Sequence, residues 1–400
     1  MTSTDFSAGL IRVTALGFIL SLAGPVIAAP MLPGVGAAMQ TVIDAREVAG
    51  AVTAVATKDK IVHLEATGFA DVAKQKPMET DAMFWIASTT KPFTGVALLM
   101  LQDEGKLSVT DPVAKYIPEF AGLKTPSGKP ANLTVAQLVM HTSGLADMKR
   151  EDVATAKVLA DLIPATLAAP MQFEPGESWK YTSSGFNVAA RIVEIVSGKS
   201  YDVFLQQRLF DPLAMKDTTF YPSEAQQARM AGNYVKNRGT GELLPQALAW
   251  PVPPRGSVPP IAAGGLFSTA GDLLQFGRML ANRGVFGGRR YLSEASFQVL
   301  TTVRTGDLAT GFSRGQINKV LGWGLGAYVL RAPHAGASAT LSAGSFGHPG
   351  ACGTHLIVDP VKGLAYVMMV QRPNLPDNFE NEPTRAFLQA VSNALAKTPQ

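Results

Sequence analysis

The spacing of apolar and polar positions changes twice along the chain. Short apolar runs with strand-like spacing begin at residues 51–56 and 61–68, and the polar segment 58–60 between them predicts a hairpin. Between residues 106 and 320 the apolar spacing is mainly helical. Strand-like runs then return at residues 322–330, 355–359 and 364–370, before a helix predicted at residues 383–396.

The middle region supplies amphipathic helices and proline-rich loops. Helices are predicted at residues 185–198, 201–210 and 269–282. Residues 250–260 are too rich in proline for regular structure and are predicted to form a surface loop. The pattern predicts an α+β fold: one antiparallel sheet built from N- and C-terminal segments and flanked by helices, with an inserted, mainly helical domain. The predicted division is residues 29–105 with 321–400 for the first unit and 106–320 for the second.

An apolar stretch at residues 13–29 follows Arg12 and ends in the small-residue pattern Val26-Ile27-Ala28. We interpret residues 1–28 as a signal peptide, which predicts export to the periplasm or the medium. The alternative is a membrane anchor, but glycine and proline interrupt the run and leave it shorter than the roughly 20 residues that a spanning helix needs. The mature chain is therefore predicted to carry no membrane span.

Composition narrows the function classes. Of the 400 residues, 46% are hydrophobic and 16% charged, which is typical of a globular protein with a large core. The net charge of +4 comes from scattered lysines and arginines with no basic run, so nucleic acid is not a predicted partner. The single cysteine, Cys352, cannot close an intramolecular disulfide, and the five dispersed histidines lack zinc spacing. No metal or other cofactor is predicted.

The candidate chemistry begins at Ser88, where an apolar lead at residues 83–87 meets a predicted helix that ends at Gly105. Ser88 and Lys91 form the only Ser-x-x-Lys in the chain. Because residues three apart share one helix face, the Lys91 amine can lie beside the Ser88 hydroxyl and take its proton if burial lowers the lysine pKa. The alternative is a capping serine next to a solvated lysine.

Two later segments could complete such a site. Tyr181 follows a turn and precedes a predicted helix, and its phenol could share a proton with a lysine; the alternative is a packing residue with one hydrogen bond. The run from Gly347 through His348 and Gly350 to Ala351 precedes a strand-like segment, where glycines would let a substrate lie against an edge strand. The alternative there is an ordinary turn with a surface histidine.

In this order along the chain, the segments resemble the serine β-lactamase and penicillin-binding-protein superfamily, specifically the class C-like branch that includes family VIII carboxylesterases and D-stereospecific peptidases. The resemblance extends over about residues 84–353. Further segments that are similar to this family's signatures are Phe84-Trp85-Ile86-Ala87, Glu104-Gly105-Lys106-Leu107, Asp111-Pro112-Val113, His141-Thr142-Ser143-Gly144-Leu145, Pro175-Gly176, Pro212-Leu213-Ala214-Met215 and the run 265–273.

The resemblance implies a mechanism. Ser88 would attack a carbonyl and form an acyl-enzyme, with Lys91 and Tyr181 activating it and protonating the leaving group. The backbone N–H groups of Ser88 and Ala351 would hold the oxyanion. Ser183, His348 and Gly350 would contact the substrate, which is expected to be a small ester or lactam.

Two departures from the family pattern bear on the substrate. Ser183 occupies the asparagine position of the usual Tyr-x-Asn motif, and His348 stands where lactamases of this fold carry a lysine. A hydroxyl for an amide and a neutral imidazole for a cation favour short-chain carboxylic esters, as in family VIII carboxylesterases, with weak β-lactamase activity still open.

Other functions remain possible interpretations of the sequence. They are a class C-like β-lactamase, a D-alanyl-D-alanine carboxypeptidase or D-aminopeptidase, and a penicillin-recognising sensor or inactive interaction module. Residues 311–315 also fit the nucleophile-elbow pattern of α/β-hydrolases around Ser313, although the polar residues 304–310 before it do not predict the strand that an elbow requires. The oligomeric state is not predicted.

Overall fold

The computed structural model of the chain describes residues 1–2, 30–311, 320–376 and 380–397. The predicted signal peptide and Ser313 therefore lie outside the described residues, and the interpretations attached to them stay predictions. Among the described helices, none combines the length and the hydropathy that crossing a membrane requires.

An eight-stranded antiparallel sheet forms the centre of the α+β fold, in the order β10-β11-β12-β13-β14-β1-β2-β3. It joins the two ends of the chain, because β14 pairs with β1, with Val52 opposite Met369. The strands of this sheet are β1 Gly50–Thr57, β2 Ile61–Asp71, β3 Lys76–Pro77, β10 Leu321–Trp323, β11 Tyr328–Leu330, β12 Phe346–Pro349, β13 His355–Asp359 and β14 Leu364–Met369.

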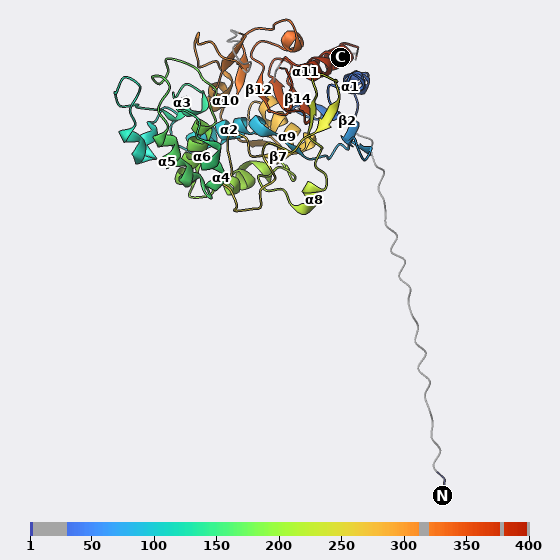
Figure 1. The fold of residues 1–400 in the computed structure, drawn as a ribbon, viewed down its shortest axis with the longest axis horizontal. Coiled ribbons are helices and arrows are strands. Elements are labelled where there is room, and N and C mark those ends of the chain that lie inside the picture. The colour runs from blue at the N-terminus through green and yellow to red at the C-terminus, as the bar shows by residue number, and fades with distance from the viewer. Residues whose placement is uncertain (3–29, 312–319, 377–379, 398–400) are drawn as a thin grey trace.

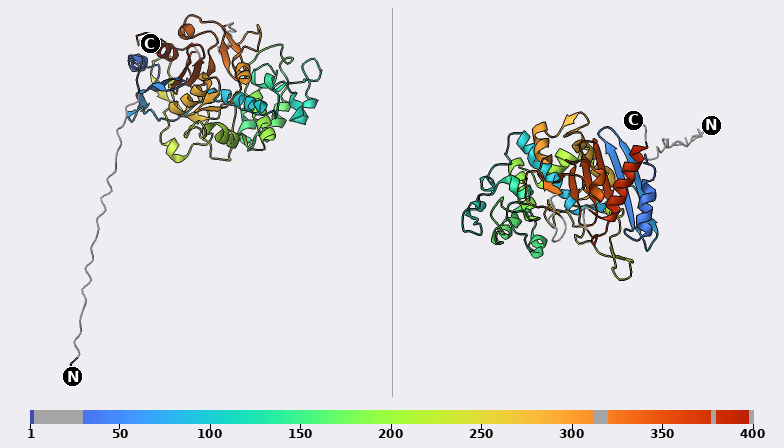
Figure 2. Two further views of the ribbon diagram at one scale, coloured as in Figure 1. Left: turned by 180° about the vertical axis from the view of Figure 1, so that it is seen from behind. Right: turned by 90° about the horizontal axis from the view of Figure 1, so that it is seen from above.

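Helices cover both faces of the sheet, so its central strands are apolar on both sides. On β1, Ala51 and Val55 face a cluster formed with α1 (Val35–Asp44) and α11 (Glu382–Ala396), which lie side by side (Figures 1 and 2). Val52, Ala54 and Ala56 of the same strand face the larger core on the other side. This alternation follows from the two-residue period of a strand.

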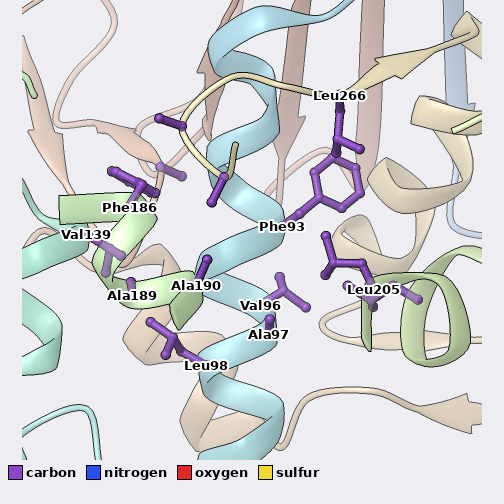
Figure 3. Packing of buried hydrophobic residues seen from close by; sticks show 14 of the residues in the cluster. Phe93, Val96, Ala97, Leu98, Val139, Phe186, Ala189, Ala190, Leu205 and Leu266 are labelled. Carbon is purple, nitrogen blue, oxygen red and sulfur yellow. The ribbon is translucent and has the colours of Figure 1, made fainter. Parts of the chain in front are cut away.

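The larger core is built around α2 (Lys91–Asp103), which is buried along most of its length. Figure 3 shows Phe93, Val96 and Leu98 of this helix among side chains of α6 (Ser184–Ser197) and α7 (Tyr201–Leu205). The rings of Phe93 and Phe276 stack at 4.0 Å, which links α2 to α9 (Ala270–Ala281). The helix that follows Ser88 is therefore held rigidly by the core.

The remaining elements are short. The helices are α3 Val135–Val139, α4 Arg150–Thr155, α5 Leu162–Ala168, α8 Glu224–Gln227 and α10 Glu294–Thr301. Two-stranded pairs are formed by β4 Phe84–Trp85 with β7 Phe267–Ser268, β5 Tyr234–Lys236 with β6 Leu243–Pro245, and β8 Val285–Phe286 with β9 Arg289–Arg290.

The α+β class, the hairpin at β1 and β2, the closing helix and the strands β13 and β14 are confirmed. The single strand predicted at 322–330 is wrong, because a turn that includes Gly326, at φ 89°, divides it into β10 and β11. The helix predicted at 201–210 continues after α7 as a π-helical turn, Gln206–Phe210. The predicted domain division stays a prediction, and α9 of the middle region packs on β1, β13 and β14.

A buried histidine makes the stability of this fold sensitive to acid. His63 on β2 is fully buried, its Nδ1 accepts the Leu32 N–H at 3.1 Å, and its Nε2 lies 2.9 Å from the Thr53 hydroxyl. Burial lowers the pKa of His63 to about 4 from an ordinary 6.5. Below pH 6.5 the His63 ring is therefore protonated in the unfolded chain, whereas in the folded chain it becomes protonated only near pH 4. The free energy of unfolding consequently falls as the pH falls from 6.5 to about 4.

We predict that His63→Asn weakens this pH dependence. Its amide oxygen can still accept the Leu32 N–H, but the variant carries no titrating ring. Between pH 7 and pH 5 the wild type should lose about 2 kcal/mol of unfolding free energy more than the variant does. Urea denaturation at the two pH values measures the difference, and equal losses in both proteins would contradict the assignment to His63.

Candidate active site

Ser88 lies in a tight turn between the β4–β7 pair and α2. The preceding residue, Ala87, has a φ of 46°, a left-handed conformation that a non-glycine residue adopts at a cost. Ser88 itself belongs to the 3₁₀ turn Ala87–Thr90, in which side chains three residues apart eclipse one another. This geometry places Lys91 Nζ 3.2 Å from Ser88 Oγ.

Lys91 is fully buried, which is unusual for a lysine. Its Nζ donates to the carbonyl oxygen of Ala263 at 2.6 Å and lies 4.8 Å from the ring centroid of Tyr181 and 5.2 Å from that of Phe186. Burial lowers the pKa of Lys91 to about 7, although the negative charge of Asp147 opposes part of the shift. Near neutral pH the amine is therefore present in both protonation states.

Tyr181 lies beside this pair, just before α6. Burial raises the pKa of the Tyr181 phenol far above its ordinary value, and a hydrogen bond with Ser88 offsets part of the rise. The free protein therefore holds Tyr181 as a neutral phenol, able to give a proton but not to act as a phenolate.

His348 on β12 contacts the Tyr181 side chain. Its Nδ1 lies 2.7 Å from the carbonyl oxygen of Pro349, which can only accept, so Nδ1 carries the proton. Nε2 is then an acceptor, and the Tyr181 hydroxyl lies 3.4 Å from it. Burial, with the nearby charge of Lys91, lowers the pKa of His348 well below its ordinary value, so the ring is neutral. The alternative interpretation, in which His348 is a surface histidine, is wrong because the residue is buried.

A cavity of about 330 Å³ opens at Ser88. Of the predicted residues, Ser88, Ser183 and Ala351 line it. Among the described residues no backbone acceptor pairs with the N–H groups of Ser88 and Ala351, so both remain available for a substrate oxygen. The other lining residues are Trp85, Ala87, Asp147, Met148, Arg150, Val153, Ser184, Asn187, Trp250, Ile261, Ala263 and Gly264.

Within the described part of the chain, Lys91, Tyr181, His348 and Gly350 are not among the residues that line this cavity, and the substrate contacts expected of His348 and Gly350 stay predictions. His348 contacts Tyr181. At Gly350 a Cβ would lie 2.1 Å from the Thr354 hydroxyl and 2.5 Å from the carbonyl oxygen of Ile86. The glycine therefore makes room for the nucleophile turn. Gly350 directly follows β12, which pairs with β11 at Phe346 and Gly347.

Several residues of the cavity were not predicted from the sequence. Asp147 accepts the N–H groups of Ser183 and Ser184 at the start of α6, which fixes it at the cavity wall. Asn187 faces the same space one helical turn after Ser183, and its side-chain oxygen accepts the Ala263 N–H at 3.4 Å. The four-residue spacing from Ser183 on a predicted helix was the available signal for Asn187.

Comparison with known proteins decides the family. A family model described as Beta-lactamase matches residues 35–391. The chain belongs to the beta-lactamase family.

Relatives of this beta-lactamase family protein have varied names. Protein Rv1367c of Mycobacterium tuberculosis is 32% identical over 372 residues, which cover 85% of this chain and 90% of that protein. Penicillin-binding protein 4 of Amycolatopsis lactamdurans is 30% identical over 265 residues, or 64% of this chain and 68% of that protein. The chain is therefore a serine hydrolase relative of penicillin-binding proteins.

Solved structures agree on the fold. EstCE1, described as a hydrolase with promiscuous acyltransferase activity, superposes with a TM-score of 0.73 at 20% identity and covers 90% of this chain and 97% of its own. At this identity the likeness supports the fold alone.

The competing nucleophile elbow gains no support from the described residues. Ser313 lies outside them, and residues 304–310, which would have to form the entering strand, contain turns and no strand.

We predict that Gly350→Ala destabilises this beta-lactamase family protein. The new Cβ would meet the Ile86 carbonyl, and overpacking of this kind costs about 1–3 kcal/mol. Gly122→Ala is the matched control, because nothing lies within 4 Å of its Cβ position and its φ is not positive. Urea denaturation of both variants measures the effect. If the two variants have equal free energies of unfolding, the turn accommodates the added Cβ without loss of stability and the prediction is wrong.

Proposed function

We propose that this protein hydrolyses short-chain carboxylic esters through an acyl-enzyme on Ser88. The observation that carries the proposal is the 3.2 Å contact between the Ser88 hydroxyl and the buried Lys91 amine, whose pKa is about 7. A hydroxyl beside an amine that is partly unprotonated at neutral pH is an activated nucleophile.

The proton transfers follow from the three side chains. The neutral Lys91 amine accepts the Ser88 proton while Oγ forms a bond to the substrate carbonyl carbon, and the N–H groups of Ser88 and Ala351 receive the oxyanion. As the ester C–O bond breaks, Tyr181 donates its proton to the leaving alkoxide and regains one from the Lys91 ammonium. Water then attacks the acyl carbon, its proton passes to the neutral Lys91, and Ser88 recovers its proton as the acid leaves.

The character of the cavity supports an ester. Its walls are mainly apolar side chains, including Trp85, Met148 and Trp250. Among the described lining residues, Asp147 is the one acidic side chain and Arg150 the one basic side chain, so the two charges balance. A neutral substrate loses less hydration on entering such a space than a carboxylate does. His348 is neutral and buried, so it offers no positive charge to the carboxylate of a lactam.

The main alternative is a β-lactamase or D-alanyl-D-alanine carboxypeptidase, and the similarity to penicillin-binding protein 4 supports it. The same nucleophile and cavity would serve either reaction, so substrate preference has to be measured. A penicillin-recognising sensor would acylate without turnover, and an inactive interaction module would not acylate.

The first test uses Ser88→Ala. We expect this variant to lose labelling by a fluorophosphonate probe and turnover of nitrophenyl butyrate, because no other group supplies the nucleophile. Ser313→Ala is the control and should label like the wild type. The ratio of kcat/KM for nitrophenyl butyrate to that for nitrocefin decides the substrate class. A higher value for nitrocefin overturns the ester proposal, and labelling of Ser88 without turnover favours the sensor.

The second test is the pH profile. Since Lys91 must be unprotonated to accept the serine proton, kcat/KM for the ester should rise with pH through about 7 and then level off. Lys91→Arg stays charged throughout and should lose about 100- to 10,000-fold in kcat/KM at pH 8. Rates measured from pH 5 to 9 provide the profile, and a wild-type profile that is flat across this range speaks against Lys91 as the base.

A further inference from the structure

His141 holds the chain on both sides of Tyr181. It follows α3, is buried, and has a φ of 63°, a left-handed conformation. Its backbone oxygen accepts the Lys180 N–H at 3.0 Å, and its Nδ1 accepts the Thr182 N–H at 3.2 Å. One residue thus holds the Trp179–Lys180 and Tyr181–Thr182 peptide groups, which lie on either side of the tyrosine.

The His141 ring also contacts the Tyr181 ring directly. The two ring centroids lie 4.4 Å apart at an interplanar angle of 31°, a tilted stack. Trp323 of β10 meets His141 edge to face at 4.6 Å and 88°, and its ring centroid lies 6.1 Å from that of Tyr181, so the three rings pack against one another. Backbone bonds and ring contact together restrict where the Tyr181 oxygen can lie.

Stability alone does not account for an imidazole at this position. Because Nδ1 accepts a hydrogen bond, the proton of the neutral ring is on Nε2. Burial, with the nearby charges of Lys91 and His348, lowers the pKa of His141 well below its ordinary value and keeps the ring neutral. Nε2 is buried and has no hydrogen-bond partner among the described residues, a cost that a phenyl ring would avoid. What histidine offers over phenylalanine is the Nδ1 acceptor.

The geometry points to His141 as a positioning residue that fixes the Tyr181 phenol against Ser88 and His348. This inference rests on the proposed function, in which Tyr181 protonates the leaving group. His141 contacts the Tyr181 ring and the chain on either side of it, so it acts through the tyrosine. A displacement of about 1 Å in a reacting group can cost on the order of 100-fold in rate.

Two variants separate the contributions of His141. His141→Phe keeps a ring against Tyr181 but removes the Thr182 acceptor. His141→Asn loses the ring but keeps an acceptor oxygen two bonds from Cβ, and asparagine tolerates the left-handed conformation better than most residues do. We expect His141→Phe to lower kcat/KM for ethyl butyrate, whose ethoxide leaving group needs the Tyr181 proton, by on the order of 100-fold. His141→Asn should recover part of that loss, and a wild-type rate in His141→Phe overturns the inference.

The matched controls are His63→Phe and His63→Asn. His63 is also a buried neutral histidine whose Nδ1 accepts a backbone N–H, but it lies on β2 among other partners. These variants should lower Tm without lowering kcat/KM for ethyl butyrate at a temperature where they remain folded. If His63 variants of equal Tm lower kcat/KM as much as the His141 variants do, loss of stability explains the effect and the positioning role is wrong.

A double-mutant cycle tests whether His141 acts through the tyrosine. In a Tyr181→Phe background, His141→Phe should cause little further loss in kcat/KM for ethyl butyrate, because the hydroxyl to be positioned is already gone. Multiplicative losses would mean that His141 acts independently and would falsify the inference.

A crystal structure of His141→Phe keeps this inference separable from the proposed function. We expect the Tyr181 oxygen to lie farther from Ser88 Oγ than in the wild type. If wild-type protein neither labels nor turns over an ester, the proposed function fails, and the tyrosine position in the variant still decides whether His141 positions it. An unmoved Tyr181 oxygen overturns the inference even if the enzyme is active.

Discussion

The site depends on one lysine amine kept out of water. Lys91 is held by its place on a core helix, by the Ala263 carbonyl and by the rings of Tyr181 and Phe186, and this burial brings its pKa close to neutrality. An exposed lysine at the same distance from Ser88 would stay protonated and could not accept a proton. The core around α2 thus determines the chemistry as well as the stability of the fold.

The nucleophile turn shows how the same packing accommodates strain. Ala87 takes a left-handed conformation, and the turn it begins is held from several sides. Trp85 Nε1 donates to the Gly264 carbonyl at 2.7 Å, Thr90 Oγ1 accepts the Leu266 N–H at 3.2 Å, and the Thr354 hydroxyl donates to the Ile86 carbonyl at 3.0 Å. Hydrogen bonds to two separate segments, 264–266 and Thr354, keep the backbone in a shape that it would not adopt alone.

Sequence patterns predicted the α+β class and much of the sheet, because β1, β13 and β14 are bounded by turn residues and packed on apolar faces. They also singled out Ser88, Lys91 and Tyr181, which the structure brings together. They could not reveal Ala263, whose contribution is a backbone carbonyl, or Asp147, whose place at the cavity depends on capping α6. They also could not reveal the contact between His348 and the Tyr181 hydroxyl, because the burial of His348 depends on long-range packing that local spacing does not encode.

The pairing of β14 with β1 has a consequence for how the molecule is made. The last strand of the chain inserts between β13 and the first strand, so more than 300 residues must be synthesised before their edges can meet. Contacts of such sequence separation close slowly, because the entropy of a very long loop is lost before they form. A nascent chain therefore emerges with β1 and β2 as an unprotected hairpin, and a chain truncated before residue 364 would lack the strand that joins β13 to β1.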